Sequence, residues 1–91
     1  MASKFLDSSE KHGIPRQDIV YAILHANYVR VLEHERVNKG RIKLYIGHPH
    51  GQTDREIEIL VHEFPESGEE ALILHVDNLA TKFTRFREEN P

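Results

Sequence analysis

Four segments between residues 28 and 76 alternate between apolar and polar side chains with a period of two, and this pattern constrains the fold more than any other feature. The segments are Tyr28–Glu35, Arg41–His48, Glu56–Phe64 and Glu70–Val76. The second segment shows the pattern most clearly, because it begins Arg-Ile-Lys-Leu-Tyr-Ile. Such alternation is typical of antiparallel strands that bury one face. Because the connections are short, the pattern predicts a four-stranded antiparallel meander.

Two helices are predicted ahead of the strands. Ala2–His12 is interpreted as a short helix, with Ser3 as its N-cap and Gly13 directly after its end. A second helix is predicted to begin at Ile14-Pro15, because proline suits the first helical position, and to end near Asn27. Its apolar residues recur at helical spacing in one stripe, which comprises Ile19, Val20, Ile23 and Leu24.

A last helix is predicted over Leu79–Glu89, where three apolar residues recur at helical spacing. The predicted fold class is therefore α+β, with two N-terminal helices, a four-stranded antiparallel meander sheet and a C-terminal helix in a single domain 1–91. Helices that are segregated from a run of strands typically pack on one face of the sheet. We expect them to cover the face that carries Ile42, Ile59, Leu72 and Leu74.

Composition narrows the class of protein. With 91 residues the chain has room for one compact core, and its formal charge of −3 lacks the basic character of a dedicated nucleic-acid binder. The absence of cysteine excludes disulfides, thiolate zinc sites and cysteine nucleophiles. No apolar run reaches the roughly 20 residues that span a bilayer, and the first residues do not resemble a signal peptide. We therefore expect a cytoplasmic protein without membrane contacts.

The sheet face opposite the helices is the sharpest candidate for a functional site. It is predicted to carry Arg30, His34, Lys43, Tyr45, Glu58, His62 and His75. Histidine, tyrosine and lysine side chains on one face suit metal-independent acid–base cleavage of RNA, in which an imidazole deprotonates the 2′-hydroxyl while a cation stabilises the phosphate. The alternative is that this face is simply a solvated or interface surface, because polar alternation is typical of such a face.

Two other features have weaker functional interpretations. His48-Pro49-His50-Gly51 offers two imidazoles to a transition metal, with the third ligand left to Asp54, His62 or Glu63, but it is also consistent with a histidine-rich hairpin loop. We therefore assign no metal ligand and no cofactor. In the last helix, three cations lie close in sequence to Phe83 and Phe86, namely Lys82, Arg85 and Arg87. One interpretation is a helix that binds RNA or docks onto a partner. The other is a pair of core aromatics beside cations that are favourable in the last turn of a helix.

Short motifs across most of the chain resemble the BrnT-type toxins of bacterial type II toxin–antitoxin pairs. Lys11-His12-Gly13-Ile14 resembles a Lys-His-Gly-hydrophobic segment that such toxins carry at the same helix junction, and 41–47 resembles their second strand. Residues 71–82 match their last strand and following helix more loosely. The resemblance implies a RelE-like ribonuclease fold, a cognate antitoxin protein as partner, and RNA or ribosome-bound mRNA as substrate.

The first functional hypothesis is therefore a toxin that cleaves mRNA by general acid–base catalysis. The resemblance implies that Arg41, Lys43 and Tyr45 lie on the phosphate side, whereas the histidines come from the sheet-face argument. The predicted catalytic residues are His62, His75, Tyr45 and Lys43, and the predicted substrate-binding residues are Arg30, Arg41, His34, Lys82 and Arg85. Two alternatives remain: a non-catalytic interaction module that uses the polar sheet face or an edge strand, and a histidine-rich metal-binding protein.

Overall fold

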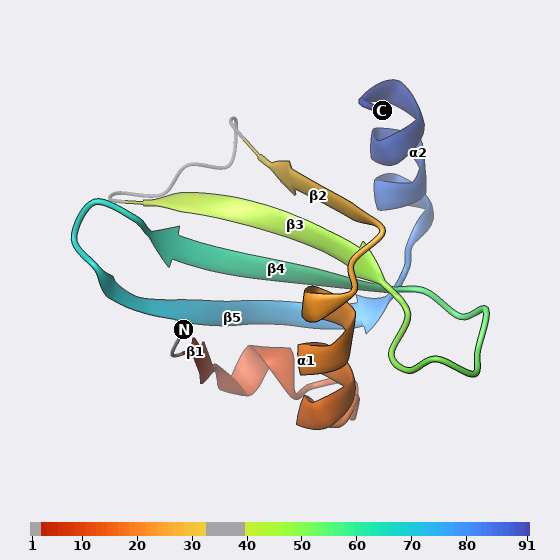
Figure 1. The fold of residues 1–91 in the computed structure, drawn as a ribbon, viewed down its shortest axis with the longest axis horizontal. Helices are drawn as coiled ribbons and strands as arrows, with labels where there is room; N and C mark the ends of the chain where they lie inside the picture. Colours follow the sequence, from red (N-terminus) through yellow and green to blue (C-terminus); the bar gives the residue numbers. More distant parts are fainter. Residues whose placement is uncertain (1–2, 33–39) are drawn as a thin grey trace.

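The computed structural model describes residues 3–32 and 40–91, which form a twisted sheet and two α-helices (Figure 1). Within these ranges the strands are ordered β1-β5-β4-β3-β2, with β1 parallel to β5 and the other pairs antiparallel. The strands are β1 (Ser3–Phe5), β2 (Tyr28–Val31), β3 (Arg41–Gly47), β4 (Ile57–Phe64) and β5 (Glu69–Asn78). The helices are a 3₁₀ turn η1 (Asp7–Ser9), α1 (Arg16–Leu24) and α2 (Thr81–Glu89).

The N-terminal segment corrects the predicted fold. The helix expected over Ala2–His12 is wrong, because residues 3–5 form β1 and pair in parallel with residues 71–73 of β5. The backbone N–H of Leu6 extends this contact by donating to the carbonyl of Ile73 at 3.1 Å, and Phe5 packs against the core. A short isolated helix is marginal in water, so these tertiary contacts prevail. The predicted pair of N-terminal helices and four-stranded antiparallel meander are replaced by one helix and a five-stranded mixed sheet.

Helix α1 follows Pro15, which is its N-cap, and it ends at Leu24, earlier than the predicted end near Asn27. It lies very close to β3 at Gly47. A Cβ atom at Gly47 would lie 2.7 Å from the carbonyl oxygen of Ala22, so only glycine fits between the helix and the strand. This close approach fixes where α1 crosses the sheet.

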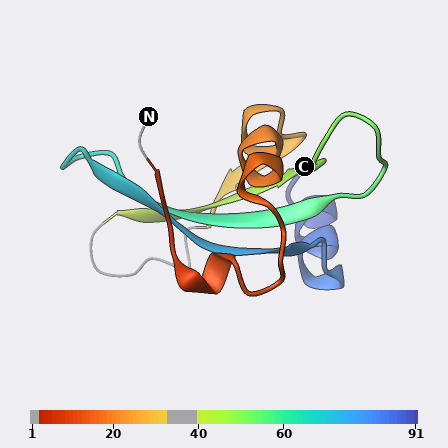
Figure 2. The same ribbon diagram turned by 90° about the horizontal axis from the view of Figure 1, so that it is seen from below.

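The two faces of the sheet carry separate apolar clusters, which contradicts the expectation that the helices share one face. Figure 2 shows α1 on one side of the sheet, and η1 and α2 on the other. The α1 face buries Ile14, Ile19, Ala22, Tyr45, Ile57, Ile59, Val61, Ala71, Ile73 and Val76. The α2 face buries Leu32, Ile42, Leu44, Ile46 and Phe83. Ile42 and Ile59, which we placed on one face, therefore lie on opposite faces.

A bulge explains why the predicted faces of β5 are also wrong. The register of β4 with β5 shifts between Leu60 and Val61, so Leu60 pairs with His75 whereas Val61 pairs with Ile73. Such a bulge inserts an extra residue and interrupts the alternation. As a result Val76 joins the α1 face, while Leu74 packs in the cluster of the α2 face.

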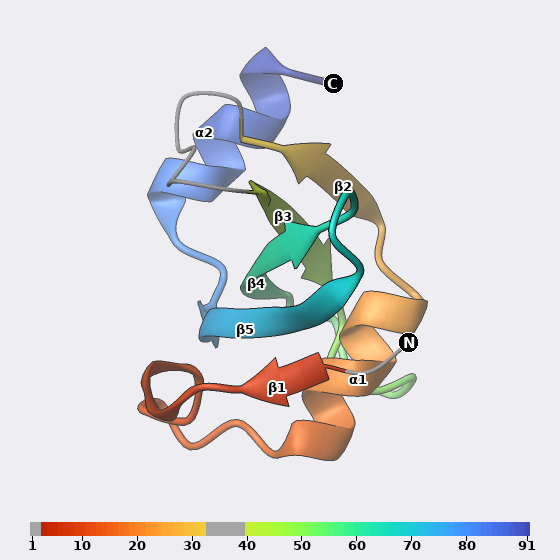
Figure 3. The ribbon, with the colours of Figure 1, turned by 90° about the vertical axis from the view of Figure 1, so that its left-hand side faces the viewer.

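Side-chain contacts hold α2 and the C-terminal residues against the sheet. Arg87 of α2 forms a two-pronged ion pair with Glu56, with N···O distances of 2.8 and 3.3 Å. The hydroxyl of Tyr28 donates to the carbonyl of Asn90 at 2.5 Å. Figure 3 shows the strands in order from β1 at one edge to β2 at the other. None of the described helices is long and apolar enough to cross a membrane.

Candidate acid–base site

A buried carboxylate on β4 anchors the candidate site. Glu58 is 3% exposed, and its Oε2 lies 2.8 Å from Nε2 of His75. Its Oε1 accepts a 2.7 Å hydrogen bond from the backbone N–H of Ala80, the residue that precedes α2. A buried carboxylate needs partners of this kind to compensate for lost hydration. Glu58 and His75 therefore form a fixed carboxylate–imidazole pair on the α2 face.

A second histidine lies next to this pair. The ring centroids of His12 and His75 are 6.1 Å apart, and the rings are nearly perpendicular, with an interplanar angle of 82°. Nε2 of His12 lies 3.4 Å from Oδ2 of Asp77. The side chain of His75 is 33% exposed and that of His12 is 37% exposed, so solvent reaches both rings. His75 is thus hydrogen-bonded to a carboxylate, His12 lies within ion-pair distance of another, and both rings are accessible from outside.

Local structure brings these side chains together from distant parts of the chain. The bulge in β5 leaves His75 on the same face as Glu58, whose partner in the β4–β5 ladder is Asp77. The 3₁₀ turn η1 is attached to β5 by the hydroxyl of Ser8, which donates to the carbonyl of Leu74 at 2.5 Å. The chain then turns at Gly13, whose φ of 69° favours glycine. His12 is carried on this turn over the end of β5.

The arrangement is suited to moving protons. When Nε2–H of His75 donates to Glu58, Nδ1 keeps its lone pair and can accept a proton, as in other carboxylate–histidine pairs. The ring centroids are 6.1 Å apart, close enough for one bound group to lie within hydrogen-bond reach of both imidazoles. One histidine can then accept a proton while the other donates one.

A second carboxylate cluster lies on the α1 face, toward the other end of β4. Glu63 accepts a 3.2 Å hydrogen bond from Nε of Arg41 and a 3.4 Å bond from the hydroxyl of Tyr45. The ammonium of Lys43 lies 3.7 Å from the same carboxylate. Burial raises the pKa of Tyr45 above 10.0; Glu63 adds to the rise and Lys43 opposes it. Tyr45 therefore stays protonated at neutral pH, and the carboxylate of Glu63 is paired with two cations.

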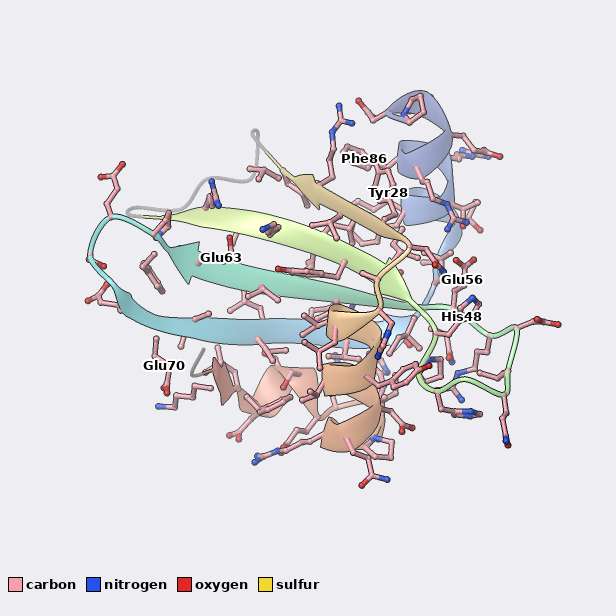
Figure 4. All side chains as sticks on the ribbon, viewed as in Figure 1. Tyr28, His48, Glu56, Glu63, Glu70 and Phe86 are labelled. Atoms are coloured by element: carbon pink, nitrogen blue, oxygen red, sulfur yellow. The ribbon has the colours of Figure 1, made fainter. Side chains whose placement is uncertain are left out.

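The predicted catalytic residues do not meet in one site. Lys43 and Tyr45 lie on the α1 face, whereas His62 and His75 lie on the α2 face, because His62 pairs with Ile42. His62 stacks on Phe64, with ring centroids 4.3 Å apart. Glu58 and Glu63 lie toward opposite ends of β4, and Figure 4 labels Glu63 at its far end. His75 is thus the one predicted catalytic residue that belongs to the candidate site.

The predicted substrate-binding residues are dispersed. Arg30 donates to the carbonyls of Asn90 and Pro91 at 3.1 and 3.2 Å, and Arg41 binds Glu63. Lys82 and Arg85 are exposed on α2, with the Lys82 ammonium 5.1 Å from the ring centroid of Phe83. His34 lies outside the described residues.

The histidine-rich turn after β3 makes local contacts. Nδ1 of His48 lies 2.8 Å from the carbonyl oxygen of Arg55, and Nδ1 of His50 accepts the backbone N–H of Gln52 at 3.3 Å. Among residues 3–32 and 40–91, no three histidine or carboxylate side chains are grouped so that they could hold a metal ion.

Sequence reasoning missed part of the candidate site. It assigned no role to His12 and did not consider Asp77, and it placed Glu58 on the polar face without recognising it as the partner of His75. The only sequence signal for His12 is its place in Lys11-His12-Gly13-Ile14, the motif that carries the family resemblance. Comparison with known proteins adds no further guide, since no family model, curated protein or solved structure matches the chain.

Proposed function

We propose that this chain is a toxin-type endoribonuclease that cleaves mRNA without a metal, using His75 and His12 as its acid–base pair. The observation that carries the proposal is the juxtaposition of two accessible histidines, each beside a carboxylate, with ring centroids 6.1 Å apart. Glu58 and Asp77 act as positioning residues. The earlier assignment of catalysis to Lys43, Tyr45 and His62 is not retained, because they lie apart from this pair.

The reaction follows from the two imidazoles. Neutral His75 removes the proton from a ribose 2′-hydroxyl, and O2′ attacks the adjacent phosphorus. The bond from phosphorus to O5′ breaks, and protonated His12 transfers its proton to the leaving oxygen. The products are a 2′,3′-cyclic phosphate and a 5′-hydroxyl end, so every atom and proton is accounted for. RNA suits such a site because it carries its own nucleophile.

Two cations that lie close in sequence to residues of the site support an anionic substrate. Lys11 precedes His12 in the turn and is exposed, and Lys82 lies in the first turn of α2, close in sequence to Ala80 and its bond to Glu58. Cations at such positions stabilise a phosphate. The resemblance to BrnT-type toxins adds an RNA substrate and a cognate antitoxin to the proposal.

The decisive experiment compares histidine variants in cells and in solution. We expect expression of the wild-type chain in bacteria to arrest growth and to yield mRNA fragments with 2′,3′-cyclic phosphate ends. His12→Ala and His75→Ala should each abolish both effects while circular dichroism shows a retained fold. The matched controls are His25→Ala and His50→Ala, which remove exposed histidines outside the candidate site and should leave activity intact.

Three outcomes contradict the proposal. The first is a wild-type chain that neither arrests growth nor cuts RNA, whether free or on ribosomes. The second is full activity in folded His12→Ala and His75→Ala variants. The third is equal cleavage of a substrate whose 2′-hydroxyl is replaced by hydrogen, because the proposed nucleophile is then absent.

A further inference from the structure

Residues 19–29 form an uncharged segment in a strongly charged chain. They contain no Asp, Glu, Lys or Arg, although these residues make up 30% of the sequence. The segment covers most of α1, the turn after it and the start of β2. The exposed large hydrophobic residues among the described ones all lie here: Val20 at 44%, Leu24 at 73% and Val29 at 42% exposure. Exposed apolar residues that are concentrated in this way indicate an interaction surface.

The same segment enters an edge strand. β2 pairs with β3 on one side, and no described residue pairs with its other side, as Figure 3 shows. The N–H of Leu32 donates to the carbonyl of Ile42 at 2.8 Å. Because bonded and non-bonded pairs alternate in an antiparallel ladder, Arg30 also bonds to β3, and the backbone groups of Val29 and Val31 point away from it. β2 therefore presents unpaired donors and acceptors at the rim of the described sheet.

We propose that this surface binds a second copy of the chain, with the two β2 strands antiparallel around a two-fold axis at Val29. In this register Val29 bonds to Val29 of the second copy, and Tyr28 faces Arg30 of the second copy. The pairing continues the sheet across the two chains and buries the exposed apolar side chains.

Charge favours a second copy over other occupants. A two-fold axis at Arg30 would place two guanidinium groups opposite each other, whereas an axis at Val29 places each one opposite a tyrosine ring. Tyr28 and Arg30 both donate to the carbonyl of Asn90, which holds them side by side on one face. A nucleic acid requires a cluster of cations, whereas among the described residues of this segment and β2 Arg30 is the one cation, and its guanidinium donates to the carbonyls of Asn90 and Pro91. An uncharged segment with unpaired strand groups is complementary to itself.

The proposed interface is separate from the acid–base site. His75 lies on β5, and β3 and β4 separate that strand from β2. A dimer formed through β2 therefore leaves the two histidines open to substrate. The dimer and the proposed ribonuclease activity can consequently fail independently of each other.

Sedimentation velocity of the purified chain across a wide range of concentrations tests the proposal. We expect the wild-type chain to reach twice its 10.6 kDa mass as the concentration rises. Val29→Lys and Leu24→Lys should each raise the dimer dissociation constant by about tenfold or more, because each places a charge in the interface. Gln52→Lys adds the same charge to an exposed loop residue and should not change the constant.

A backbone variant separates strand pairing from apolar contact. Val29→Pro removes an N–H that points away from β3, so the ladder with β3 should survive while the dimer weakens. Circular dichroism checks the fold of each variant, and Leu24 is exposed enough that its substitution leaves the core intact.

Three results would overturn the proposed dimer. One is a wild-type chain that stays at monomer mass at every concentration. Another is a dimer that folded Val29→Lys, Val29→Pro and Leu24→Lys do not weaken. The last is a chain that is monomeric alone and pairs through β2 only with a different protein.

Discussion

Two glutamates on β4 have different kinds of partner, although they are only five residues apart in sequence. Glu58 faces α2, where it holds a histidine and a backbone N–H. Glu63 faces the opposite side and is surrounded by Arg41, Lys43 and Tyr45. The first carboxylate orients an imidazole, which can both accept and donate a proton, whereas the second binds two cations and a tyrosine hydroxyl. Partner type, and not burial alone, distinguishes a candidate catalytic carboxylate from a structural one.

The largest expected effect comes from replacing Glu58. Glu58→Gln keeps the shape of the side chain but removes the charge that orients His75, so RNA cleavage should fall by about 100-fold or more. The variant should also lose roughly 1–3 kcal/mol of unfolding free energy, since a buried hydrogen-bonded charge is altered. Single-turnover cleavage across a pH series and urea unfolding measure the two effects.

A merely structural role for Glu58 would lower the unfolding free energy without altering the pH profile of cleavage. A positioning role for Glu58 in catalysis requires a changed pH profile as well, because Glu58 fixes which ring nitrogen of His75 is free to accept a proton. An unchanged rate and profile in folded Glu58→Gln would remove it from the site.

Glu63→Gln provides the matched substitution on the other face. It leaves two cations without their carboxylate, so we expect a loss of about 1 kcal/mol in unfolding free energy and no loss of RNA cleavage. The pKa of Tyr45 should fall toward its ordinary value, because Glu63 contributes to its elevation. Ultraviolet difference titration of the tyrosine hydroxyls detects this shift, and a strong loss of cleavage would place Glu63 in the active site instead.

A third carboxylate, Glu56, extends the comparison to the pH dependence of the unfolding free energy. The hydrogen bond from Arg87 lowers the pKa of Glu56 below 4.5, so the folded state binds this proton less tightly than the unfolded state. The stabilisation is therefore complete above the unfolded pKa and disappears as pH falls through the lowered folded pKa. Glu56→Gln should cost about 1 kcal/mol at neutral pH and progressively less as pH falls below 4.5. Urea unfolding at neutral pH and in a series of acid buffers tests this, and an equal loss at every pH would contradict it.

The smallest expected effect concerns Lys82 on α2. Its ammonium lies over the ring of Phe83 at an exposed position, so Lys82→Ala should change stability by about 0.5 kcal/mol. RNA cleavage should weaken slightly and depend less on salt, because one phosphate contact is lost. Thermal unfolding and cleavage at several salt concentrations separate the two contributions, with Arg85→Ala as the comparison on the same helix.

Local sequence patterns account for much of the backbone. The alternation that predicted strands appears in β3 over Arg41–Gly47 and in β4 over Ile57–Phe64, and helical spacing appears in α2 over Thr81–Glu89. These elements are long enough for periodicity to be visible. β1 has three residues and depends on a parallel partner about 70 positions away, so no local pattern could reveal it.

The candidate site was less predictable than the elements that build it. His75 was identified by its residue type on a sheet face, but its partner depends on the bulge between Leu60 and Val61. The same bulge, together with the β3–β4 register, separates Lys43 and Tyr45 from the histidines. A shift of one residue moves a side chain to the opposite face, and the sequence does not state the register.

The sequence by itself determined an α+β chain with alternating strands, a helix after Pro15, an uncharged segment over 19–29 and a C-terminal helix with two aromatic residues at helical spacing. Only the tertiary structure decided which faces the strands share, where β1 pairs, and that His12 lies beside His75. Periodicity and turn chemistry act over a few neighbouring residues, which the sequence lists in order. Register, bulges and contacts between distant segments depend on packing of the whole chain, and these contacts bring the acid–base pair together.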